Sequence, residues 1–144
     1  RFWQVAQKPG KPITFAARDG QLYFGLPGNP VSSLVCFDLY VAPALRRALG
    51  MHDVFAPTVD VVMETAVRTA KGLCELVRCT LRQDGDRLLA SPTGTQSSGA
   101  LRSLSLADCL VISPPGVDEL AAGARAQALR IGPVHAPSRA HPFA

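Results

Sequence analysis

The hydrophobic spacing of this chain changes at Gly50, and the change divides the sequence into two parts. Between Val31 and Leu49, apolar residues recur mostly every three or four positions, which is typical of a helix with one buried face. After Gly50, short runs rich in β-branched residues alternate with turn residues, as they do in small all-β domains. The pattern therefore predicts an α/β segment followed by an all-β segment.

The first segment combines short extended runs with one helix. Asp19-Gly20 lies between two apolar runs and predicts a tight hairpin. Asn29 can cap exposed helix amides, Pro30 suits the first helical position, and Gly50 can close the far end. Pro43 lacks a backbone N–H, so we expect a kink or the start of a second helix there.

The second segment predicts five or six short strands, a number that suits a small barrel or a sandwich. The strand candidates are residues 59–64, 73–81, 87–90, 109–112 and 125–131, and a short helix is expected within 99–107. We place the two domains at residues 1–52 and 53–134. The tail at 135–144 is rich in Pro, Ala and His, and we expect it to be disordered.

Composition and charge exclude several classes of protein. No apolar run approaches the roughly 18 residues that span a bilayer, and no leader opens the sequence, so we expect a cytoplasmic protein without a membrane partner. The formal charge is +4, but the basic residues are scattered, which does not indicate a nucleic-acid partner. The four cysteines form no C-x-x-C pair, so we expect reduced thiols and no metal site.

Two turn motifs could hold an anion. Lys8-Pro9-Gly10-Lys11-Pro12 places two ammonium groups on a tight turn in which Gly10 allows the backbone to approach a ligand. Leu26-Pro27-Gly28-Asn29-Pro30 lies between a strand and a helix start, where unpaired amides and the helix dipole favour negative charge. Taken alone, each motif is better explained as an ordinary turn.

The two motifs together resemble the molybdopterin molybdenumtransferase family, which includes the E domain of gephyrin. The resemblance continues downstream, where Glu75-Leu76-Val77-Arg78 is similar to a signature of the family's C-terminal domain. The segment 92–99 then resembles the family's Gly-x-Gln-x-Ser loop. Order and spacing match over about residues 2–132 of this chain. The resemblance implies the C-terminal half of a molybdopterin-binding α/β domain, followed by a small C-terminal β domain.

The resemblance also implies an activity. Family members insert molybdate into the dithiolene of adenylylated molybdopterin and release AMP, in a reaction that depends on Mg2+. The catalytic candidates carried over by motif are Lys8, Pro27 and Pro30. The candidates for binding the anionic substrates are Lys8, Lys11, Gly28, Asn29, Arg78 and Ser98. The implied partners are a second copy in a homodimer, whose cleft forms between subunits, and other proteins of molybdenum cofactor biosynthesis.

The chain also departs from the family pattern. Gln4 stands where members often carry a basic residue, and the upstream acidic residues that would bind Mg2+ are absent, so we expect these 144 residues alone to be inactive. Arg78 could instead extend from the edge of the core to solvent. Ser98 could instead cap the short helix that follows it. The alternative function is a non-catalytic interaction module of the gephyrin type, and a nucleic-acid-binding barrel is disfavoured because it would lack aromatic stacking residues.

Overall fold

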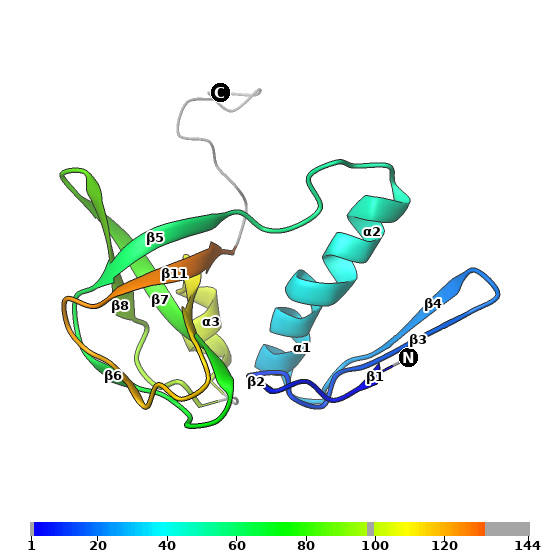
Figure 1. Cartoon of the computed structure of the whole chain (residues 1–144), viewed down its shortest axis with the longest axis horizontal. Helices are drawn as coiled ribbons and strands as arrows, with labels where there is room; N and C mark the ends of the chain where they lie inside the picture. Colours follow the sequence, from blue (N-terminus) through cyan, green and yellow to red (C-terminus); the bar gives the residue numbers. More distant parts are fainter. Residues whose placement is uncertain (1, 98–99, 132–144) are drawn as a thin grey trace.

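The computed structural model describes residues 2–97 and 100–131. Figure 1 shows two lobes: a β3–β4 hairpin with a long helical segment, and a curled β-sheet. The expected disordered tail at 135–144 lies outside the described residues. Among the residues that are described, no helix combines the length and the apolar character needed to cross a membrane.

The first lobe begins with a three-stranded sheet. Its strands are β1 (Phe2–Trp3), β3 (Thr14–Arg18) and β4 (Gln21–Gly25), in the order β1-β3-β4. The predicted hairpin turn is confirmed, because Asp19 and Gly20 join β3 to β4 and both have positive φ angles. Aromatic side chains hold one face of this sheet, and the ring centroids of Phe15 and Phe24 lie 5.0 Å apart.

One long helical segment follows, and its start, kink and end are those expected from the sequence. It consists of α1 (Pro30–Cys36), the π-helical turn η1 (Phe37–Val41) and α2 (Ala42–Ala48). The side chain of Asn29 caps the start of α1. The π-helical turn directly precedes Pro43, whose ring cannot donate the regular helix hydrogen bond. Gly50, with a φ of 78°, follows the end of α2.

The second lobe is a closed five-stranded barrel, which decides between the two β architectures that the sequence allowed. Its strands are β5 (Thr58–Met63), β7 (Cys74–Asp84), β8 (Arg87–Pro92), β9 (Cys109–Ser113) and β11 (Arg125–Arg130). They follow the order β7-β8-β5-β11-β9, and β9 pairs again with β7 to close the barrel. The short helix α3 (Leu101–Ser105) lies within the range expected for it.

The barrel interior is apolar. Its buried residues are Val61, Met63, Val77, Cys79, Ala90, Cys109, Val111, Leu120 and Ala128. Sequence analysis missed a two-stranded ribbon of β6 (Val67–Arg68) and β10 (Glu119–Leu120), because strands of two residues carry no readable alternation.

The two lobes are joined through a strand and a second apolar cluster. Strand β2 (Gln7–Lys8), from the first lobe, pairs in parallel with the start of β7 in the barrel. Val35 of α1 packs with Leu76 and Leu110 on the outer face of the barrel, and Leu39 and Leu104 flank this cluster. The proposed division at residue 52 therefore separates segments that share a sheet and a core.

Candidate functional site

The junction of the lobes brings together the first anion-binding motif and the downstream Glu-Leu-Val-Arg motif. The β2–β7 register places Lys8 directly beside Glu75. The Lys8 ammonium lies 2.9 Å from Oε1 of Glu75, and the Lys8 side chain is 43% exposed while that of Glu75 is 4% exposed. Lys8 is thus a half-exposed cation held against a buried carboxylate, and the sequence analysis gave no role to Glu75.

Both oxygens of Glu75 have partners. Oε1 accepts from Lys8, and Oε2 accepts from the backbone N–H of Ala70. Glu75 also pairs in register with Ser113, which is fully buried and whose hydroxyl lies 3.2 Å from that of Thr69. The lobe junction therefore contains a buried polar cluster with one cation at the surface.

The Lys-Pro-Gly-Lys-Pro turn is built against the protein on one side. Gly10 is buried with a φ of 106°, and a Cβ at this position would lie 2.5 Å from Sγ of Cys36 and 2.7 Å from Nε2 of Gln7. The expectation that Gly10 lets a ligand approach the backbone is therefore wrong, because α1 occupies that space. Lys11, in contrast, is exposed and free to meet an anion.

Arg78 is neither exposed nor extended to solvent. It is 1% exposed, so the interpretation as a side chain reaching out from the core edge is wrong. Its Nη2 donates to the carbonyls of Thr95 and Ser97, at 3.1 and 3.0 Å. Nε is buried and has no hydrogen-bond partner among the described residues. Burial lowers the pKa of Arg78, and the charge of Glu75 opposes this shift.

The same loop is fastened to the backbone of Arg78 by Gln96, a second residue that sequence analysis left without a role. Oε1 of Gln96 accepts from the Arg78 amide at 2.9 Å, and Nε2 donates to the Arg78 carbonyl at 3.2 Å. The side chain thus substitutes for a strand partner where β8 has ended. Ser98, the expected substrate-binding residue of this loop, lies outside the described residues, and the N-cap of α3 is Ala100.

The Leu-Pro-Gly-Asn-Pro motif caps the helix that follows it. Oδ1 of Asn29 accepts from the amides of Val31 and Ser32, at 3.1 and 3.4 Å. These two amides of the first helical turn are therefore not free for a ligand, whereas the amides of Gly28 and Asn29, which precede the helix, are not taken up by this cap. Pro27 is buried and its carbonyl accepts from the Ser33 hydroxyl, whereas Gly28 and Pro30 are exposed.

Three of the predicted elements meet at one edge of the molecule. In Figure 1, β2 and the first turn of α1 lie at the lower edge between the lobes, and α3 lies on the barrel side of α1. Contacts between α1 and α3, and the pairing of β2 with β7, confirm this proximity. Among the predicted site residues at this edge, Lys8 is charged and partly exposed, and Glu75 is its ion-pair partner.

Two of the four cysteines lie inside the barrel and are not reactive groups. Cys79 and Cys109 are paired in register inside the barrel, and burial raises the pKa of each thiol to about 12. Both are therefore protonated at neutral pH and are poor nucleophiles. The described residues contain no group of three His, Cys, Asp or Glu side chains that could hold a metal ion.

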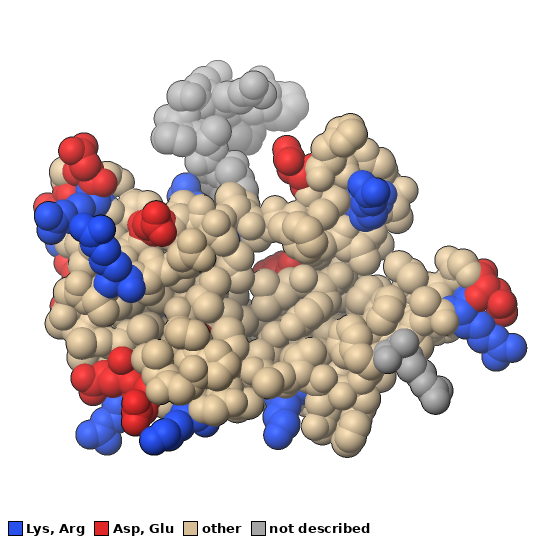
Figure 2. All heavy atoms as spheres, viewed as in Figure 1, with Lys and Arg blue, Asp and Glu red and all other residues tan. Residues whose placement is uncertain are grey.

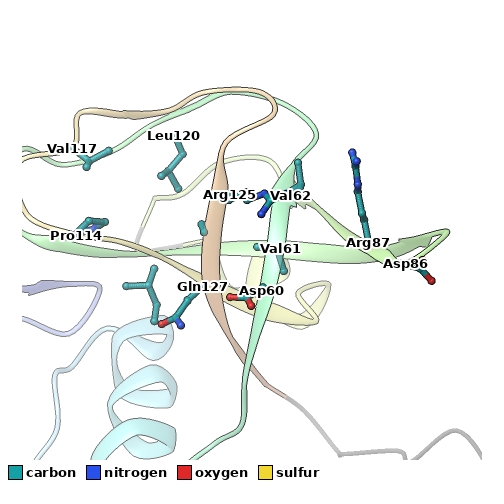
Figure 3. Close-up of a pocket in the computed structure, with 12 residues that line it drawn as sticks. Asp60, Val61, Val62, Asp86, Arg87, Pro114, Val117, Leu120, Arg125 and Gln127 are labelled. Atoms are coloured by element: carbon teal, nitrogen blue, oxygen red, sulfur yellow. The ribbon is translucent and has the colours of Figure 1, made fainter.

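A separate hollow lies on the barrel. This cavity of about 840 Å³ has an apolar floor, and none of the predicted site residues lines it. Figure 3 shows Val117 and Leu120 at one end and Asp86 and Arg87 at the other, with Asp60 and Arg125 between them. Acidic and basic side chains are also interspersed on the face of the barrel shown in Figure 2. The cavity is therefore not a strongly cationic site.

Comparison with known families identifies the chain. Residues 60–131 match the family model described as the MoeA C-terminal region (domain IV), and residues 1–47 match a probable molybdopterin binding domain. The chain belongs to the molybdopterin molybdenumtransferase (MoeA) family. Its Glu75 and Arg78 lie in the MoeA C-terminal region, while Lys8 lies in the other, so the ion pair links the two family regions.

Similar proteins agree with this assignment. The chain is 32% identical to gephyrin of Dictyostelium discoideum over 93% of its own length and 22% of that protein. It is 33% identical to molybdopterin molybdenumtransferase 2 of Mycobacterium tuberculosis over 88% of the chain and 31% of that protein. A crystal structure of a molybdopterin biosynthesis MoeA protein from Pyrococcus horikoshii has a TM-score of 0.72 at 31% identity, covering 89% of this chain and 31% of that one. The chain therefore spans less than a third of each of these relatives.

Proposed function

We propose that this chain is part of an enzyme that inserts molybdate into adenylylated molybdopterin with release of AMP. The observation that carries the proposal is the half-exposed Lys8 ammonium, held at the junction of the two family regions by Glu75. Molybdate and the phosphates of the cofactor are anions, and an ammonium with free N–H groups binds anions through charge-assisted hydrogen bonds. The name of the M. tuberculosis relative supports the same reaction class.

The remaining candidates divide into groups that touch substrate and groups that shape the site. Lys8 and Lys11 hold the anionic substrates, and the exposed Gly28 lies on the neighbouring turn. Pro27, Asn29 and Pro30 keep that turn and the helix start in place. Arg78 positions the loop that carries Ser98, and Ser98 contacts substrate.

The Mg2+ of the proposed reaction does not fit the residues described, since they offer no cluster of acidic or other ligating side chains. We place its ligands in the family segments that these 144 residues do not include, and we derive no step through the ion. The proposal further includes a homodimer, contacts with other proteins of cofactor biosynthesis, a cytoplasmic location, and domains at residues 1–52 and 53–134.

The test uses the polypeptide at its native length, expressed from its own locus. AMP release from adenylylated molybdopterin is measured with molybdate and Mg2+, for the wild type and for Lys8→Ala. Loss of a charge-assisted hydrogen bond to an anion is expected to lower the rate by about 10- to 100-fold. Lys71→Ala removes an exposed lysine paired with Asp118 and serves as the control.

An equal rate for Lys8→Ala and wild type would contradict the proposed role of Lys8. Absence of AMP release from the wild type, although the protein is folded, would instead favour the interaction-module alternative. The intact mass of the same polypeptide, compared with the 15.3 kDa of these residues, shows whether further family segments accompany them.

A further inference from the structure

Glu75 is a fixed negative charge at the lobe junction. It is 3% exposed, and its two oxygens accept from the Lys8 ammonium and the Ala70 amide. A buried carboxylate with both oxygens engaged cannot turn away when a ligand arrives.

The backbone at Lys8 is held by contacts that do not involve the Glu75 side chain. Lys8 lies in β2, which pairs with β7, and its neighbours Gln7 and Pro9 are both buried. Gln7 is itself held, because its Nε2 donates to the Pro9 carbonyl at 2.9 Å and its Oε1 accepts from the Tyr40 hydroxyl. Removal of the Glu75 charge would therefore leave the Lys8 backbone in place.

We propose that Glu75 limits the affinity of Lys8 for anions and so sets how tightly the site holds an anionic ligand. The inference rests on the proposed function, in which Lys8 holds an anionic substrate. An anion on the free side of the ammonium would lie within about 6 Å of the Glu75 carboxylate, given ordinary hydrogen-bond lengths. Repulsion over that distance opposes anion binding. Without Glu75 the Lys8 side chain would be less ordered before binding, but the cost of ordering it is smaller than the repulsion that is relieved. The site therefore releases a simple anion readily.

The experiment measures the dissociation constant of molybdate by calorimetry for the full chain and its Glu75→Gln variant. Glutamine has nearly the shape of glutamate, and its one carbonyl oxygen can still accept from the Ala70 amide, so the fold should persist. We expect Glu75→Gln to bind molybdate about tenfold more tightly, because the negative charge is gone. Unchanged or weaker binding would overturn the proposal.

Matched variants separate this inference from the proposed function. Asp118→Asn removes a carboxylate whose partner Lys71 lies 3.9 Å away at an exposed position, and it should leave the dissociation constant unchanged. Glu75→Asp keeps the negative charge and should show little of the increase in molybdate affinity. Lys8→Met should abolish binding with or without Glu75→Gln. Molybdate binding that does not depend on Lys8 would overturn both claims, whereas Lys8-dependent binding without the Glu75→Gln gain would overturn this one alone.

A second measurement needs no change at Glu75 and so does not depend on the folding of that variant. In the Lys11→Ala variant, Lys8 and Glu75 cancel one another, so molybdate affinity should vary by less than about twofold between about 20 and 200 mM NaCl. A decrease of about tenfold over that range would show an uncompensated cation and would overturn the proposal.

Discussion

The two turn motifs each contain a glycine, and the surroundings of these two glycines differ. Gly10 is buried at positive φ against Cys36 and Gln7, whereas a Cβ on Gly28 would meet nothing within 4 Å. The first position is therefore constrained by packing, and the second is not. A sequence shows a glycine in each motif but not the neighbour that requires it.

We predict that Gly10→Ala lowers the free energy of unfolding by about 2–4 kcal/mol, from the forced contact and the unfavourable φ. Gly28→Ala should change it by no more than about 0.5 kcal/mol. Urea denaturation of the two variants and the wild type measures both values. A Gly10→Ala protein as stable as Gly28→Ala would show that α1 does not pack against the turn as described.

At the scale of elements, the loop 93–97 is held to β7 from both directions. Arg78 donates to carbonyls of the loop, and Gln96 bonds both backbone groups of Arg78. The sequence predicted the loop, the strand and the following helix correctly. It could not predict that Arg78 is buried, because a period-two pattern assigns a strand face but not what covers that face.

We predict that Gln96→Ala lowers the free energy of unfolding by about 1–3 kcal/mol, because the amide of Arg78 would be left without a hydrogen-bond partner. Gln83→Ala is the matched control, since Gln83 donates to the Gly85 carbonyl at an exposed position, and it should cost less than about 0.5 kcal/mol. Thermal and urea unfolding give both values. Equal effects of the two substitutions would mean that Gln96 does not fasten the loop.

For the whole molecule, the two lobes form one unit through β2 and the cluster around Leu76. The change of pattern at Gly50 correctly separated a strand-and-helix segment from a barrel. The pairing of β2 with β7 could not be predicted, because two residues joined to a strand more than 60 positions later leave no local signal. For the same reason Glu75 was missed as the partner of Lys8.

We predict that Leu76→Asp detaches the helical segment from the barrel, since a carboxylate buried without a partner costs several kcal/mol. Hydrogen exchange should then quicken at least about tenfold in α1 and α2, while amides of β5 and β11 stay protected. Thr80→Asp, at an exposed position on the same face of β7, should change hydrogen exchange in neither the helical segment nor the barrel. Equal loss of protection in both lobes would show that they unfold together.

The most direct test of the anion site is to locate bound molybdate. Crystals grown with molybdate and measured at the molybdenum absorption edge give an anomalous difference map that places the metal without reference to any assumed site. We predict the strongest peak about 4 Å from Nζ of Lys8, where an oxygen of molybdate accepts a hydrogen bond from the ammonium. A strongest peak in the barrel cavity beside Arg87 and Arg125, with none at Lys8, would contradict it.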